Sequence, residues 1–108
     1  MRLVITKDGA VGVGQQFVIG LDLSQCGLPE NFWALQWEER GVNQGHIEYD
    51  SPLIDNMSIT ELPAWANACV AVWQVEIDRQ AIEQAEAEQA EAQRLADQQA
   101  KRLAAQQA

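Results

Sequence analysis

Two short runs in which apolar residues alternate with other residues constrain this chain more than any other feature. In the first run, Trp33, Leu35 and Trp37 occupy every second position. This is the period-two pattern of a β-strand that buries one face. In the second run, Ile47 and Tyr49 alternate with polar residues in the same way. The sequence therefore predicts two strands that each carry large apolar side chains on one face.

The polar segment between these two runs favours a turn. It contains Gly41, Asn43 and Gly45, residues that adopt turn conformations at little cost. We therefore expect a β-hairpin in which the aromatic and aliphatic side chains share one face. So much apolar surface needs a cover from elsewhere in the chain, and the apolar stripe that begins at Trp65 is the best candidate.

The N-terminal part predicts a three-stranded meander. Leu3 to Thr6 is rich in β-branched residues, and the dipeptide Asp8-Gly9 after it is favoured in tight hairpin turns. Val11 to Val13 would form the return strand, and Gly14-Gln15 permits a second turn into Phe17 to Ile19.

Two segments without periodicity are expected to be connections. Gly20 to Asn31 contains glycines, a proline and several polar residues, which predicts a loop that crosses to the Trp33 strand. Asp50 to Met57 is expected to be a second connection, in which Leu53 and Ile54 pack against the core.

A helix is expected to start a few residues after Ser58. Ser58 and Glu61 have capping-box spacing, but Pro63 is tolerated only in the first turn, which favours Thr60 as the cap. The helix has an apolar stripe at steps of three and four residues, widened by Trp65, and the stripe consists of Leu62, Ala66, Cys69, Trp73 and Ile77, with Val70 and Val72 beside it. This stripe is predicted to cover Trp33, Leu35 and Trp37.

The same helical register continues through Ala81 to Ala108, but the apolar stripe fades. Ala, Gln and Glu dominate this segment, and neither Gly nor Pro interrupts it, so propensity favours one long helix. Leu95 and Leu103 form a sparse seam that permits weak self-association and helix contact. The predicted class is α+β: a small antiparallel sheet, meander plus hairpin, packed on the start of a long C-terminal helix. The predicted domains are a folded part, 1–80, and a helical extension, 81–108.

Charge and cysteine content exclude several classes of function. The net charge is −9, and only 7 residues are Lys or Arg, which argues against a nucleic-acid partner. The sequence contains neither a signal-peptide core nor a membrane-spanning run, so a protein without a membrane partner is expected. Cys26 and Cys69 lack metal-ligand spacing and are interpreted as reduced thiols of a cytoplasmic protein.

No pattern indicates catalysis. His46 near Glu48 has no accompanying nucleophile and is interpreted as a surface strand residue. We therefore expect a protein that is not an enzyme and that has no catalytic, metal or cofactor site. The aromatic residues are candidates either for the core or for contact with a partner protein, and they are Trp33, Trp37, Tyr49, Trp65 and Trp73.

Several motifs together resemble a known family. In chain order they are DGxVxV, GLDLS, LPEN, ALQW, GxIEY and ITELPAWANACVAVWQ, which span Asp8 to Gln74. ALQW at Ala34–Trp37 and GxIEY at Gly45–Tyr49 are the most specific. The order is similar to that of small phage and prophage tail fibre assembly proteins, also called tail assembly chaperones.

The resemblance implies a binding role in fibre assembly, with a tail fibre protein as partner, without enzymatic activity or cofactor, in the cytoplasm of the bacterial host. Two alternatives remain open. One is a structural component of the phage tail, located in the virion. The other is an acidic phage-encoded inhibitor that binds a basic surface of a host protein.

Overall fold

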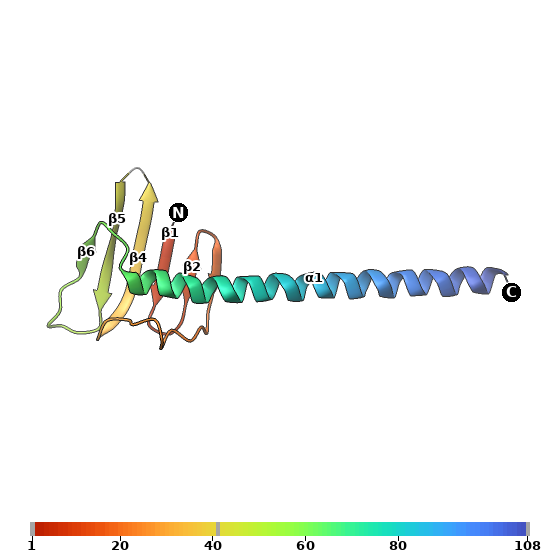
Figure 1. The fold of residues 1–108 in the computed structure, drawn as a ribbon, viewed down its shortest axis with the longest axis horizontal. Coiled ribbons are helices and arrows are strands. Elements are labelled where there is room, and N and C mark those ends of the chain that lie inside the picture. The colour runs from red at the N-terminus through yellow and green to blue at the C-terminus, as the bar shows by residue number, and fades with distance from the viewer. Residues whose placement is uncertain (1, 41, 108) are drawn as a thin grey trace. The chain divides into compact units, whose positions relative to one another are not determined.

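The computed structural model describes residues 2–40 and 42–107. Over these residues it contains six strands and one helix: β1 (Arg2–Thr6), β2 (Val11–Val13), β3 (Gln16–Val18), β4 (Phe32–Arg40), β5 (Val42–Tyr49), β6 (Met57–Ile59) and α1 (Ala64–Gln107). All the strands belong to one antiparallel sheet with the order β3-β2-β1-β4-β5-β6 (Figure 1). The predicted α+β class is confirmed.

The chain divides into two compact units. The first, Met1–Glu76, contains the sheet and the first turns of α1, and the second, Ile77–Ala108, consists of the remainder of that helix. In the second unit every residue from Ala81 to Gln107 is exposed. The independence of 1–80 from 81–108 stays a prediction.

The meander forms where the N-terminal pattern predicts it. Leu3 pairs with Val13 and Ile5 with Val11 across β1 and β2, and β3 pairs with β2 on its other side. Gly9 makes the first turn possible, because its φ of 92° is one that residues with a side chain rarely adopt. The third strand is Gln16–Val18, one residue earlier than expected.

The hairpin of β4 and β5 pairs the two most specific motifs residue against residue. Leu35 lies opposite Ile47, and Trp37 lies opposite Gly45. The expectation that Asn43 and Gly45 belong to the turn is wrong, because both lie within β5, whereas Gly41 lies outside the described residues.

Gly45 is needed for close packing rather than for a turn. A Cβ at this position would lie 2.3 Å from the carbonyl oxygen of Gln36 and 3.0 Å from Cε3 of Trp37. The Trp37 indole therefore lies across the space that a side chain at Gly45 would fill.

The segment before the helix differs from expectation. Met57–Ile59 forms the edge strand β6, with Met57 opposite Ile47, where a connection had been expected. Leu53 is 93% exposed and Ile54 37% exposed, so the prediction that they pack against the core is wrong. The reason is local: the Ser51 hydroxyl and carbonyl accept hydrogen bonds from the backbone N–H groups of Leu53 and Ile54, which fold this loop onto itself at the end of the sheet.

The helix begins at Ala64, later than predicted. The carbonyl of Pro63 accepts hydrogen bonds from the N–H groups of Ala66 at 3.0 Å and Asn67 at 3.4 Å, so Pro63 occupies the capping position. Thr60 is not the cap. Strand β6 extends to Ile59, and Leu62, which precedes Pro63, is disfavoured in helical geometry, so the helix cannot start directly after Thr60.

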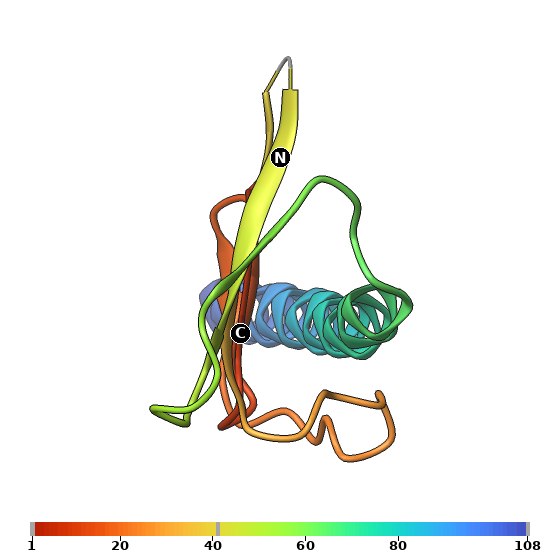
Figure 2. The same cartoon turned by 90° about the vertical axis from the view of Figure 1, so that its left-hand side faces the viewer.

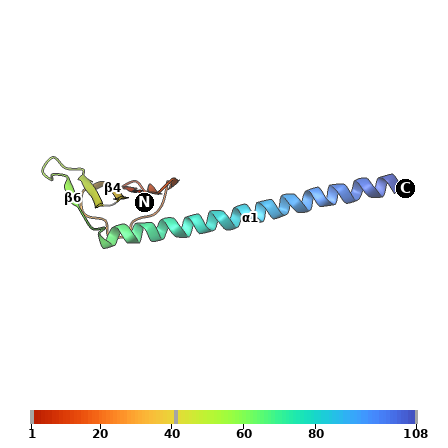
Figure 3. The ribbon, with the colours of Figure 1, turned by 90° about the horizontal axis from the view of Figure 1, so that it is seen from above.

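The start of α1 covers one face of the sheet, as Figures 2 and 3 show. Ala66 and Cys69 are fully buried and Trp73 is 6% exposed, which confirms the centre of the predicted stripe. The buried residues of the sheet that share this face are Leu3, Ile5, Val11, Val18, Phe32, Leu35, Trp37 and Ile47. Burying a Val, Leu, Ile or Phe side chain contributes about 1.5–3 kcal/mol. These buried side chains between the sheet and α1 therefore supply the main stabilisation of the first unit.

Candidate functional site

An irregularity in β4 determines which tryptophan reaches the surface. Phe32 pairs with Tyr49 and Ala34 with Glu48, so Trp33 is an extra residue between two registered pairs. Such a β-bulge re-aims the side chain of the extra residue. Phe32 is 4% exposed, whereas Trp33 is 45% exposed. The expectation that the helix covers Trp33 is therefore wrong.

The exposed indole is held in place by a lysine and an aspartate, and we call Lys7, Trp33 and Asp50 the Trp33 cluster. The Nζ of Lys7 lies 4.4 Å from the centroid of the Trp33 ring and 3.1 Å from Oδ2 of Asp50. The Lys7 backbone N–H also donates to the Trp33 carbonyl at 3.0 Å. An exposed ion pair contributes little to stability, but here it orients an ammonium group over an aromatic ring.

A pocket of about 460 Å³ adjoins the cluster at Lys7. The loop between β3 and β4 forms much of its wall, and its lining residues are Lys7, Asp8, Gly9, Leu21, Asp22, Leu23, Ser24, Gly27 and Leu28. Hydrogen bonds from the Ser24 hydroxyl and N–H lower the pKa of Asp22, and a hydrogen bond from the Thr6 hydroxyl lowers the pKa of Asp8. Both carboxylates are therefore ionised at neutral pH, and they make this pocket acidic.

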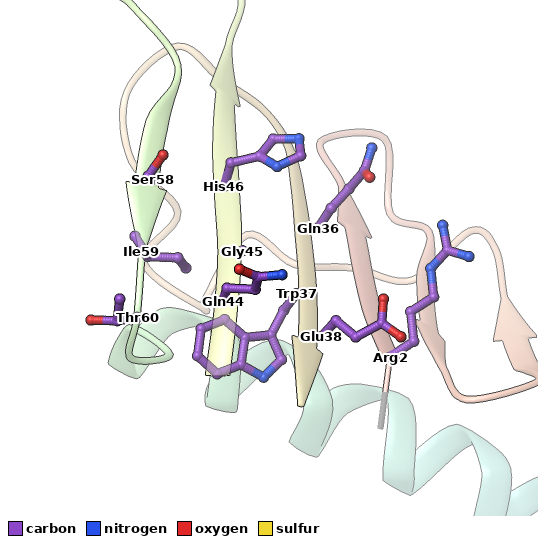
Figure 4. A pocket seen from close by; sticks show the side chains of 10 residues that line it. All are labelled: Arg2, Gln36, Trp37, Glu38, Gln44, Gly45, His46, Ser58, Ile59 and Thr60. Atoms are coloured by element: carbon purple, nitrogen blue, oxygen red, sulfur yellow. The ribbon is translucent and has the colours of Figure 1, made fainter. Parts of the chain in front are cut away.

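A second pocket of about 480 Å³ lies at strands β4, β5 and β6, and its lining includes residues of both faces of the sheet (Figure 4). Its lining residues are Arg2, Gln36, Trp37, Glu38, Gln44, Gly45, His46, Ser58, Ile59 and Thr60. His46 Nε2 lies 3.3 Å from Glu48 Oε1, and its side chain is 43% exposed. Within residues 2–40 and 42–107, no group of three or more His, Cys, Asp or Glu side chains could hold a metal ion.

The other aromatic candidates lie on the covered face. Trp37 is 2% exposed and Trp73 6% exposed. Trp65 is partly buried and packs edge-to-face on Phe32, with ring centroids 5.0 Å apart. Tyr49 is also partly buried. These four side chains are therefore poorly placed to be the first contact of a partner.

The two leucines of the predicted helix seam lie in the second unit. Leu95 and Leu103 are each 52% exposed. Beside Leu95, Arg94 forms an ion pair at 2.5 Å with Glu91, three residues earlier on the same helix. The seam is thus available for contact with another helix.

Sequence reasoning missed Lys7 and Asp50 as site residues. They are distant in the sequence, and an isolated Lys or Asp carries no signal. The bulge does have a signal in the sequence. Phe32 and Trp33 are adjacent large aromatic residues, and in a regular strand they could not both face the core.

Comparisons with protein-family models, with curated proteins and with solved structures found no match to this chain. The predicted resemblance to tail fibre assembly proteins therefore stays a prediction from the motifs. Among the helical residues that the structure describes, no stretch is both long and apolar enough to cross a membrane.

Proposed function

We propose that this protein is a non-enzymatic binding protein that assists the assembly of a phage tail fibre in the cytoplasm of the bacterial host. The observation that carries the proposal is the Trp33 cluster. Tryptophan is enriched among the residues that dominate the binding energy of protein interfaces. Trp33 is half-exposed and already oriented by Lys7, so its side chain loses little conformational entropy when a partner binds.

The surroundings of the cluster favour a particular kind of partner segment. The adjoining pocket carries the carboxylates of Asp8 and Asp22, and the chain as a whole is strongly acidic. A segment with an apolar or aromatic side chain next to a Lys or Arg would place the first on Trp33 and the second near these carboxylates. A tail fibre segment of this composition is the proposed ligand.

The position of the motifs also supports the proposal. ALQW and GxIEY come together in one hairpin, where Trp37 packs across Gly45. The two most specific motifs of the resemblance are thus packed against each other in this hairpin. Its strand β4 also carries Trp33.

A structural component of the tail is the second candidate function. The exposed Leu95 and Leu103 favour it, because a permanent helix bundle would bury such a seam. The two functions differ in whether the protein is present in finished particles.

Co-expression with a phage tail fibre protein tests the proposal. We expect soluble, oligomeric fibre with the intact chain, less of it with a chain that ends at Gln80, and insoluble fibre without the chain. The chain should be absent from purified particles. Equal fibre assembly in all three cases would refute the chaperone role, and stoichiometric presence in particles would favour the structural component.

A further inference from the structure

The second unit carries large apolar side chains that no described residue covers. Every residue from Ala81 to Gln107 is exposed, and Ile82, Leu95 and Leu103 are each more than half exposed. Exposed helices gain most of their stability when an apolar face packs against another element. This part of α1 is therefore a surface for another helix.

The exposed side chains follow a seven-residue repeat. Residues at alternating steps of three and four form what we call the distal face, and they are Ile82, Ala85, Gln89, Ala92, Ala96, Gln99, Leu103 and Gln106. This average spacing of about 3.5 residues is that of a two-helix coiled-coil seam. One border of the distal face is formed by three residues spaced seven apart, Glu88, Leu95 and Arg102.

Charge is divided along the same segment. Residues 81–92 contain four glutamates and neither Lys nor Arg, whereas residues 93–107 contain three basic residues and one acidic residue. Two parallel copies of the helix would place glutamates beside glutamates. In the antiparallel orientation, the acidic part of each copy lies beside the basic part of the other, and attraction replaces repulsion. The distal face is therefore complementary to itself in reverse.

We propose that the distal face binds a second copy of this chain, antiparallel, as a reversible two-helix coiled coil. The two copies are related by a twofold axis beside Leu95, so every other contact occurs twice. The inference depends on the repeat and the charge order of the second unit, and it is independent of the function proposed above.

One register satisfies the whole distal face. When Leu95 lies opposite Leu95 of the second copy, Leu103 packs on Ala85, and a large side chain meets a small one. Helices with small residues at the seam approach closely, which increases the contact of the larger side chains. The other layers pair Ala92 with Ala96, Ile82 with Gln106, and Gln89 with Gln99, whose amides are matched donors and acceptors.

The same register places Glu88 opposite Arg102 of the second copy. Oε1 of Glu88 accepts a hydrogen bond from Nε2 of Gln84 at 3.2 Å, and the second carboxylate oxygen can accept from a guanidinium. Among residues 2–40 and 42–107, none forms an ion pair with Arg102. Pairing across the two copies would give this cation an acidic partner at each end of the seam.

The composition of the distal face makes the dimer weak. Each copy contributes few large apolar side chains, and glutamines occupy positions that a stable coiled coil fills with Leu or Ile. The ion pairs are exposed, so added salt screens them. We therefore expect a dimer that forms at high chain concentration and dissociates as the salt concentration rises.

Sedimentation equilibrium of the full-length chain tests this expectation. Measurements up to about 1 mM chain cover the weakest affinity that still gives a specific dimer. We expect a monomer–dimer equilibrium that shifts toward monomer in high salt. A chain that stays monomeric throughout, or that forms trimers or tetramers, would overturn the proposal.

Charge exchange tests the orientation. Glu88→Arg places two like charges together at each end of the seam and should weaken dimerisation about tenfold. Adding Arg102→Glu to the same chain exchanges the two charges and should restore the wild-type affinity. In a parallel dimer residue 88 lies beside residue 93, so the second substitution could not rescue the first. Failure of the rescue would contradict the antiparallel register.

Glu83→Arg is the matched control. It changes the net charge by the same amount, but residue 83 lies outside the distal face and its border. We expect its dimerisation to stay within about twofold of wild type. The substituted side chains are exposed, and far-ultraviolet circular dichroism verifies that each variant keeps its helix. Equal weakening by Glu83→Arg and Glu88→Arg would show that net charge, and not the proposed pairing, controls association.

Discussion

The indole Nε1 of Trp73 donates a hydrogen bond to the backbone carbonyl oxygen of Gln16, at 3.1 Å. Gln16 begins β3, the edge strand at one end of the sheet, and Trp73 lies on the covered face of α1. The bond therefore fixes how the start of the helix is aligned on the sheet. Apolar contacts alone would permit a range of similar alignments.

Replacing this indole should reveal the contribution of the bond. Trp73→Phe keeps most of the apolar area and removes the donor, and we expect it to lower the free energy of unfolding by about 1–2 kcal/mol in urea titrations. Trp37→Phe is the matched control, because the Trp37 Nε1 is buried without a hydrogen-bond partner among the described residues. Trp37→Phe loses volume but no hydrogen bond. A Trp73→Phe variant as stable as wild type would show that the bond does not align the helix.

The bulge predicts opposite outcomes for two tryptophans of one strand. Trp37→Ala should lower the free energy of unfolding by about 3–5 kcal/mol, because it empties a packed interior. Trp33→Ala should cost about 1 kcal/mol or less, since the ring is 45% exposed and loses mainly its contact with Lys7. Thermal melts of the two variants measure the difference. Equal destabilisation would contradict the bulged geometry.

Two strand glycines provide a sharper test of the hairpin. A Cβ at Gly45 would lie 2.3 Å from the Gln36 carbonyl oxygen, so backbone must move in Gly45→Ala. A Cβ at Gly12 would also lie 2.3 Å from its nearest neighbour, but that neighbour is the ring of Phe17, which is 57% exposed and can swing aside. We expect Gly45→Ala to lower the melting temperature much more than Gly12→Ala. The reverse order would show that Trp37 does not pack across Gly45.

Removal of the distal helix tests the predicted domain division. A chain that ends at Gln80 should keep its cooperative thermal transition and lose helical ellipticity in proportion to the residues removed, because Ala81 to Gln107 are exposed. A chain that ends at Ala71 is the control. It lacks Trp73 and should not fold cooperatively. Loss of the transition in the first truncation would show that the extension is needed for folding.

The meander and the hairpin strands could be predicted because local rules determine them. Asp8-Gly9 specifies a tight turn, and alternation identifies the strands on either side of it. The central helix stripe was also predictable, since its period requires no knowledge of its partner. The prediction for Gly45 was wrong because glycine serves both turns and close packing, and only the position of the Trp37 ring distinguishes the two.

The remaining features depend on tertiary contacts. Alternation from Trp33 to Trp37 assumes an uninterrupted ladder, and the bulge breaks that assumption at its first residue. Met57–Ile59 is extended because it pairs with the edge of β5. Three residues are too few for their sequence to predict this pairing.

Trp33 is the proposed anchor for a fibre partner, and calorimetric titration of a tail fibre protein with purified variants tests this role most directly. We expect Trp33→Ala to weaken binding by roughly 30-fold or more, as loss of about 2 kcal/mol at an interface anchor would do. Phe17→Ala, which removes another half-exposed aromatic ring, at β3, should bind like wild type. Unchanged affinity in a folded Trp33→Ala variant, or equal loss in both variants, would contradict the account.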